Sequence, residues 1–232
     1  MTKIKKIKIP AFLFLLIFIF ISCIGQNSNV FTPVPDFSIY ESNNSIDINS
    51  IIGTKDDGAA AEHLPTWLFA YIEGGIEAVE KLDSYNNKYA FIGINEGINF
   101  TALTKWADNI SAVYDFPIMA AQRTGNRMIL TASQYPDDEY GIFYETMIKN
   151  AYNNEYPGAV KEDVYWIKVR FEDENTHEYK EKYMFFVLIT INKTPMQVII
   201  RDMISKTIDT VNLSRNQRNT VNRLRQNFFE GF

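Results

Sequence analysis

The sequence predicts an α+β fold, in which antiparallel strands combine with helices around one core. Residues 164–171 alternate apolar and polar side chains, which is the period of a strand with one covered face. Residues 183–191 form an apolar run, typical of a central strand. Apolar residues recur at helical spacing between 68 and 82 and again between 103 and 122. Two strands and several amphipathic helices in one chain therefore define the expected class.

The first half of the predicted domain places a strand between two helices. A helix is expected within residues 64–82, and the apolar run 89–94 predicts a buried strand. A second helix starts near Phe100. Residues 115–117 (Asp-Phe-Pro) are expected to kink or break it, because proline removes a helical N–H and disfavours helical geometry in the preceding residue. The expected apolar face of this helix comprises Leu103, Trp106, Ala107, Ile110, Val113 and Tyr114.

The second half begins after a turn at 135–138 with a helix over 139–150. The two strands follow, and their charged connection, 172–182, predicts a hairpin with a long solvent-facing loop. Thr194-Pro195 is a helix start, and Ser214 to Gln217 has the pattern of a capping box that opens a last helix. The expected buried faces of these three helices are Ile142, Phe143, Met147 and Ile148; Met196, Ile199, Ile200, Met203, Ile204 and Ile208; and Val221, Leu224 and Phe228.

Residues 1–22 have the pattern of a secretory signal. Four lysines without an acidic residue precede an eleven-residue apolar run from Ala11 to Ile21. A helix needs about 20 apolar residues to cross a hydrocarbon core of about 30 Å, so this run is short for a membrane span. We therefore expect a cleaved signal, with an uncleaved single-pass anchor as the alternative.

The residues that end this run resemble the lipobox of bacterial lipoproteins, in which a small residue precedes the cysteine that becomes the lipidated first residue of the mature chain. Ser22 and Cys23 fit that pattern, whereas Phe20 and Ile21 depart from the usual leucine and small residue. Cys23 is the sole cysteine of the chain, which excludes a disulfide framework and a zinc site built on cysteines. The alternative is an ordinary signal peptide that contains a buried cysteine.

Cleavage before Cys23 would make the chain more acidic. It removes four lysines from 23 basic residues and leaves 19 against 28 acidic residues, a net charge of −9. Nucleic acid is therefore an unsuitable partner, since its phosphates would be repelled. Residues 23–61 are rich in Asn, Ser, Pro and Asp, which predicts a tether, with residues 45–49 able to form a short edge strand.

The order of features from 64 to 205 resembles the LPP20-type lipoproteins, a family of bacterial envelope proteins. The resemblance rests on residues 65–67 (Pro-Thr-Trp), the strand and turn 89–97, the alanine-bearing helix around Trp106, and the two strands after Gly158. It implies an LPP20-like domain over 62–210: a small curved antiparallel sheet of about three to four strands packed on a long kinked helix. A C-terminal amphipathic helix is expected over 211–232.

The resemblance also implies attachment to the outer membrane through lipid, such as palmitate, on Cys23, and roles in envelope assembly or surface interaction rather than catalysis. It transfers no catalytic residue. The sequence departs from the family pattern at Pro117, at the bulky Trp106 and in an extra segment over 73–87.

The residues that could carry chemistry have simpler interpretations. His63 and His177 have no histidine or cysteine partner at ligand spacing, so both are expected to be surface residues. Residues 137–139 (Asp-Asp-Glu) lack the spacing of a calcium loop and fit the acidic start of a helix. No Gly-x-Ser-x-Gly turn or phosphate-binding loop occurs. We therefore expect that the protein binds no cofactor or metal and is not an enzyme. A hydrolase is the alternative.

The last helix carries the main basic concentration of the sequence, namely Arg215, Arg218, Arg223 and Arg225. These arginines are expected to form a solvated helix face, with contact to acidic lipid or to an acidic groove of a partner as the alternative. The leading functional hypothesis is a lipid-anchored envelope module that binds another envelope protein or itself. The second hypothesis is a ligand-binding lipoprotein that holds a small apolar or aromatic molecule between sheet and helix.

Overall fold

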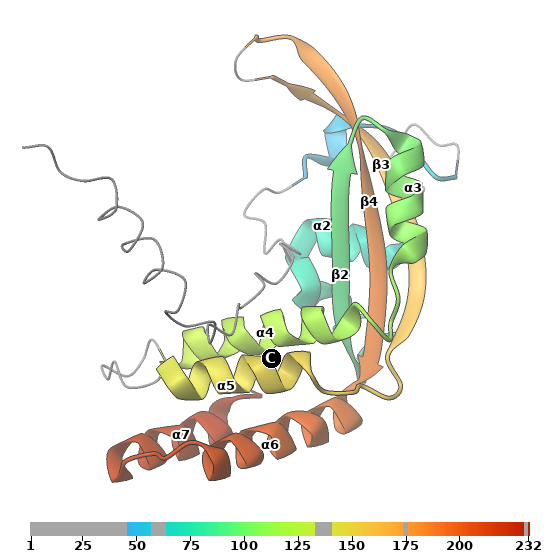
Figure 1. Ribbon diagram of the computed structural model, residues 1–232. Coiled ribbons are helices and arrows are strands. Elements are labelled where there is room, and N and C mark those ends of the chain that lie inside the picture. The colour runs from blue at the N-terminus through green and yellow to red at the C-terminus, as the bar shows by residue number, and fades with distance from the viewer. Residues whose placement is uncertain (1–45, 57–63, 133–140, 174–175, 230–231) are drawn as a thin grey trace, which may run out of the picture. The chain divides into compact units, whose positions relative to one another are not determined.

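The α+β class is confirmed by the structure, a computed structural model that combines one antiparallel sheet with helices (Figure 1). The residues that it describes are 46–56, 64–132, 141–173, 176–229 and 232. The predicted signal and lipobox, residues 1–23, lie outside them. So does the tether up to residue 45.

The sheet has four strands in the order β1-β3-β4-β2, and all neighbours are antiparallel. The strands are β1 Ile51–Thr54, β2 Lys88–Gly97, β3 Val160–Glu172 and β4 Tyr179–Asn192. β4 is therefore a central strand, as its two-sided apolar sequence predicts, and seven consecutive residues, 185–191, are buried. The expected alternation of β3 is also confirmed, because Tyr165, Ile167 and Val169 are buried and their neighbours are more exposed.

The hairpin between β3 and β4 is confirmed, but its loop is shorter than predicted. The strands pair as far as Glu172 and Tyr179, so the loop covers 173–178 rather than 172–182. Polar residues such as Lys180 and Glu181 belong to strands here, because the paired arm extends past the end of β2 and keeps its side chains in solvent.

One face of the sheet is covered by α2, Thr66–Val79. Trp67, Leu68 and Tyr71 pack there against Ile92, Ile167 and Phe186. The helix is interrupted at Gly74 and Gly75, whose backbone angles are non-helical. The apolar spacing over 68–82 predicts a continuous helix, and the structure replaces it with two short helical pieces.

The other face of the sheet carries the remaining helices. They are α3 Phe100–Asn109, α4 Phe116–Ala132, α5 Gly141–Tyr152, α6 Lys193–Thr210 and α7 Arg215–Asn227. Their largest buried side chains include Phe116, Met119, Phe143, Met147 and Phe228, which form one cluster with Phe91 and Val187 of the sheet. Figure 1 shows α4, α5, α6 and α7 gathered at one end of the sheet, while α3 lies along it.

The long helix predicted from about residue 100 is broken rather than kinked, which is one of the two outcomes that the sequence predicts, and the chain forms the separate helices α3 and α4 there. Ile110 is extended, and its neighbour Ser111 donates its backbone N–H to the Asp115 carboxylate at 2.7 Å. Lys161 Nζ donates to the carbonyl oxygens of Ala107 and Ile110 at 2.6 and 3.1 Å, which satisfies the end of α3. Pro117 is the second residue of α4, where its missing N–H costs no helical hydrogen bond.

Three residues that were predicted to lie on buried helix faces are exposed. Val113 and Tyr114 are 71% and 81% exposed, because α3 ends before them. Ile142 is 69% exposed at the start of α5, whereas Phe143 and Met147 are buried as predicted.

The short edge strand predicted at 45–49 is also displaced. Residues 48–50 form a 3-10 helix, η2 Ile48–Ser50, with Asp47 as its cap, and the strand follows as β1. The last part of the predicted tether thus belongs to the sheet.

Candidate functional site

The helix α7 has the capping box that the sequence predicts. Gln217 N donates to Ser214 Oγ at 3.3 Å, and Ser214 N donates to Gln217 Oε1 at 2.6 Å. Val221, Leu224 and Phe228 are buried, which confirms the expected docking face of α7. The sequence is sufficient to predict these two features, because the cap and the buried face of α7 both depend on residues close together in the chain.

The arginines of α7 lie on the outer side of this docked helix. Arg215, Arg218, Arg223 and Arg225 are all exposed. Arg218 Nε donates to the carbonyl oxygen of Leu213 at 3.3 Å. Arg215, Arg223 and Arg225 form no ion pair with an acidic side chain in the described part of the chain. This arrangement can bind an anionic surface or group, since each guanidinium group can donate two parallel N–H hydrogen bonds to a phosphate or carboxylate.

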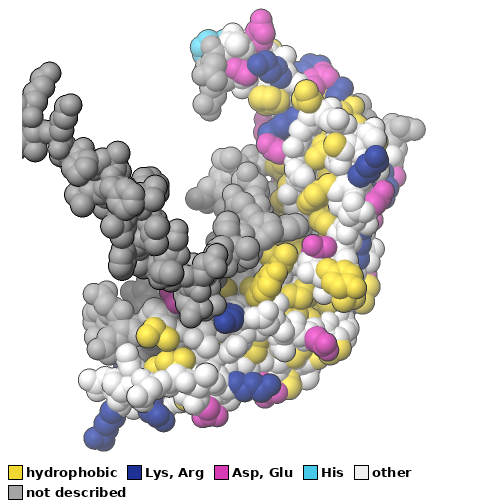
Figure 2. All heavy atoms as spheres, in the orientation of Figure 1, with side chains coloured by type: hydrophobic (Ala, Val, Ile, Leu, Met, Phe, Trp, Pro, Cys, Tyr) yellow, Lys and Arg dark blue, Asp and Glu magenta, His cyan; other side chains and the backbone are white. Residues whose placement is uncertain are grey.

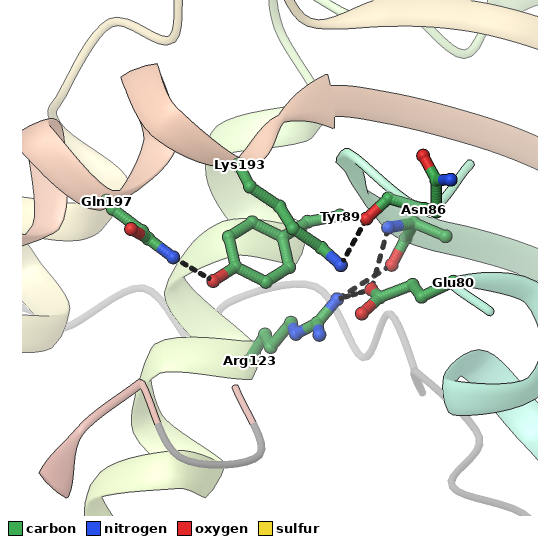
Figure 3. Close-up of polar contacts among 7 residues, drawn as sticks. Glu80, Asn86, Tyr89, Arg123, Lys193 and Gln197 are labelled. Carbon is green, nitrogen blue, oxygen red and sulfur yellow. Dashed lines mark hydrogen bonds and ion pairs between the residues drawn. The ribbon is translucent and has the colours of Figure 1, made fainter. Parts of the chain in front are cut away.

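A second polar cluster, which the sequence does not predict, is centred on Arg123 of α4 (Figure 3). Arg123 Nη1 donates to Glu80 Oε1 at 2.8 Å and to the carbonyl oxygen of Ala90 at 2.9 Å. Glu80 Oε1 also accepts the Ala90 N–H at 2.8 Å. The ion pair therefore satisfies both backbone groups of Ala90 and joins the end of α2, the strand β2 and α4.

Aromatic rings enclose the Arg123 guanidinium. The rings of Tyr89, Phe91 and Phe232 have their centroids 5.1, 5.1 and 4.9 Å from Arg123 Cζ. Phe232 packs edge-on against Tyr89, with centroids 5.0 Å apart, and is buried. The cluster thus holds Phe232, downstream of α7, against β2 and α4.

Two residues of α6 complete the cluster. Gln197 Nε2 donates to the Tyr89 hydroxyl oxygen at 2.9 Å, and Lys193 Nζ donates to the carbonyl oxygen of Asn86 at 2.8 Å. Burial raises the pKa of Tyr89 above its usual value, so this hydroxyl stays protonated at neutral pH. Figure 3 shows Gln197, Tyr89, Lys193, Asn86, Arg123 and Glu80 arranged as a bridge between elements. We assign this cluster a structural role, because its polar groups are directed at one another.

The sequence gives only a weak signal for this cluster. Arg123 lies next to an apolar stripe and has no acidic partner on its own helix. Glu80 is 43 residues away and follows the break in α2. Such a pair depends on the tertiary path of the chain, which helical periodicity does not encode.

The other candidates lie at the surface or outside the described residues. His177 is in the β3–β4 loop, is exposed, and has its Nδ1 3.0 Å from Glu172 Oε1. Cys23, His63 and residues 137–139 lie outside the described residues. Among the described residues, no group of three or more His, Cys, Asp or Glu side chains could hold a metal ion.

The region between sheet and helices, where the second hypothesis places a ligand, contains large aromatic and apolar side chains. Phe91 and Phe116 meet there with ring centroids 4.6 Å apart, and Tyr156 contacts Phe116 at 5.2 Å. The ligand-binding hypothesis stays a prediction.

Comparison of the chain with family models, curated proteins and solved structures found no match. The LPP20 resemblance therefore remains a prediction that rests on the sequence. In the described part of the chain, every helix is too short or too polar to cross a membrane.

Proposed function

We propose that the chain is a non-enzymatic, lipid-anchored protein of the bacterial cell envelope, of the LPP20 type. In this proposal a lipid on Cys23 holds the protein at the outer membrane. The α+β module binds another envelope protein or a second copy of the chain.

The observation that carries the proposal is the order of charge, apolarity and residue size over the first 23 residues. The chain starts with a segment that contains four lysines, which is followed by an eleven-residue apolar run. The small residue Ser22 and the sole cysteine, Cys23, come directly after this run. The lysines and the apolar run are what a secretory signal requires, and Ser22 and Cys23 are what the resemblance to the lipobox implies for lipid attachment. One acyl chain binds a membrane reversibly, and two or three bind firmly, because each buried CH₂ contributes about 0.8 kcal/mol.

The fold supports the proposal at a general level. The Arg123–Glu80 and Gln197–Tyr89 contacts join separate elements of the fold, and the exposed arginines of α7 offer a surface for interaction. An interaction module needs both a stable scaffold and an accessible patch.

Substitution of Cys23 by Ala is the direct test. We expect Cys23→Ala to abolish incorporation of a labelled fatty acid and to move the protein out of the detergent phase on phase partitioning. Equal detergent partitioning of this variant and the parent protein would refute the proposal and favour the single-pass anchor.

Position 22 supplies the matched control. Ser22→Ala keeps a small residue before the cysteine, so labelling should persist. Ser22→Trp should block processing while leaving Cys23 in place. Identical labelling of both variants would show that residue 22 is not read as part of a lipobox.

A further inference from the structure

We infer that the outward face of α7 docks on the phosphate headgroups of anionic phospholipids, in the leaflet that carries the lipid anchor. The inference rests on the proposed function for the location of the protein, and on α7 itself for the ligand. The outward face is defined by the exposed arginines Arg215, Arg218, Arg223 and Arg225.

The composition of this face is the first argument. The helix has four arginines and no acidic residue, so this face is locally positive, opposite in sign to the net charge of the whole chain that disfavours nucleic acid. Where the side chains are described, every exposed residue of α7 is Arg, Asn or Gln. A protein interface usually has an apolar or aromatic centre, which this face lacks. A charged surface is therefore the partner that its chemistry fits.

The position of the charges within the helix is the second argument. The amino terminus of a helix carries partial positive charge and favours acidic side chains. α7 begins with Arg215, has Arg218 three residues later, and has no acidic residue in its first turn. The helix thus accumulates positive charge at the end where its own electrostatics oppose it. A docked anion would relieve this repulsion and accept hydrogen bonds from both arginines.

The shape of the charge distribution favours a planar surface over a narrow groove. At about 100° per residue, the four arginines cover about 160° of the helix circumference. Arg218 and Arg225 lie on one flank, Arg215 in the middle and Arg223 on the other flank. Figure 2 shows basic side chains, in dark blue, projecting at the lower left, where Figure 1 places the start of α7. A flat array of headgroups can reach all four side chains at once.

The test uses the lipidated full-length protein in vesicles. After lipidation of Cys23 the mature chain has no free thiol, so a cysteine at exposed Asn222 can take up one fluorophore. A control variant carries the fluorophore at Tyr179, which is 74% exposed on the β3–β4 arm. Quenching by lipids with a nitroxide headgroup then reports which position lies at the membrane surface.

In vesicles of phosphatidylcholine mixed with phosphatidylglycerol, we expect strong quenching at position 222 and weak quenching at 179. The quenching at 222 should fall in phosphatidylcholine alone, and it should fall when the salt concentration rises from about 0.15 M to about 1 M. The docking constant should decrease by about fivefold for each arginine changed to Gln, the equivalent of about 1 kcal/mol per charge at an anionic surface.

A charge-matched variant separates docking by α7 from general attraction. The arginine variant changes all four arginines of α7 to Gln and should lose the quenching at position 222. The charge-matched variant instead changes four exposed lysines outside α7 to Gln and should keep that quenching. These lysines are Lys81, Lys105, Lys149 and Lys180. Equal effects of the two four-residue variants would overturn the inference. It would also be overturned if the arginine variant kept its quenching but lost crosslinks to an acidic envelope protein in cells.

The number of fluorophores separates this inference from the proposed function. Two fluorophores per chain at the Asn222→Cys variant would mean that Cys23 is a free thiol, and the lipoprotein proposal would fail. The same quenching comparison in a Cys23→Ser background would then still decide whether α7 contacts anionic lipid.

Discussion

At the scale of single residues, Glu80 and Arg123 determine how three elements meet. Their side chains are only 10% and 15% exposed, and the pair binds both backbone groups of Ala90 in the edge strand β2. An edge strand has unpaired N–H and C=O groups, and this pair satisfies one residue of that edge. The pair is therefore both an ion pair and a substitute for a neighbouring strand.

Loss of one partner of this pair should be costly. We expect Glu80→Gln to lower the free energy of unfolding by about 3 kcal/mol, because the guanidinium loses its carboxylate in a mostly buried place. Urea unfolding of the detergent-solubilised protein measures the change. Glu77→Gln in the same part of the chain is the control, with an expected effect under about 0.5 kcal/mol, since Glu77 and Lys81 are exposed and 4.0 Å apart. Similar losses in both variants would contradict the role given to Glu80.

Burial of Tyr71 predicts a loss of stability at high pH. Its burial beneath the sheet raises the pKa of Tyr71 to about 12, whereas an unfolded tyrosine ionises near 10. The folded state therefore favours the protonated ring, and this contribution is complete below pH 10 and is lost as the pH rises towards 12. It amounts to about 2–3 kcal/mol.

The measurement is urea unfolding between pH 9 and pH 12, where Tyr71→Phe should reduce the pH dependence of the unfolding free energy. Tyr179→Phe, at an exposed tyrosine, is the control and should leave it unchanged. If the unfolding free energy of Tyr71→Phe depends on pH as it does in the parent protein, another group is responsible for the loss of stability at high pH.

At the scale of elements, the sequence predicts those features that depend on near neighbours. The alternation of β3, the two-sided burial of β4 and the capping box at Ser214 are all confirmed. Breaks are harder to predict, because apolar spacing continues across them. Val113 and Tyr114 follow the helical pattern of α3, yet the Ser111–Asp115 turn and the Lys161 cap end the helix earlier. Lys161 is more than 50 residues away, so its effect is invisible to local pattern.

The break within α2 is a second case, and it requires glycine. Gly75 has φ 68° and ψ −164°, a region that is essentially restricted to glycine. The break redirects the chain so that Val79 is buried and Glu80 reaches Ala90. A conformation that costs about 1–3 kcal/mol for other residues thus positions the ion pair.

Gly75→Ala should therefore lower the free energy of unfolding by at least about 1 kcal/mol. Gly141→Ala at the start of α5 is the matched control, because an added Cβ there meets no atom of the described residues within 4 Å and Gly141 is not among the glycines with positive φ. Thermal unfolding of both variants provides the comparison. If Gly75→Ala is as stable as the parent, the break in α2 does not depend on that glycine.

At the scale of the whole molecule, the fold class and the arginine face follow from local sequence patterns, whereas the Arg123 cluster depends on the tertiary fold. The fold class could be predicted because the spacing of apolar residues in the sequence distinguishes the main helices from the strands. The arginine face could also be predicted, since capping and burial on α7 place its four arginines outward. The Arg123 cluster could not, because it joins residues from four elements and includes Phe232. The proposed lipid anchor involves residues 1–23, which lie outside the described residues.

In the function proposed here, the mature protein begins at a lipidated Cys23. Mass spectrometry of the intact protein, extracted from membranes, tests this most directly. We predict a chain that lacks residues 1–22 and carries the added mass of a glyceride with its acyl chains on residue 23. A mature chain that retains Met1, or that begins elsewhere with Cys23 unmodified, would contradict it.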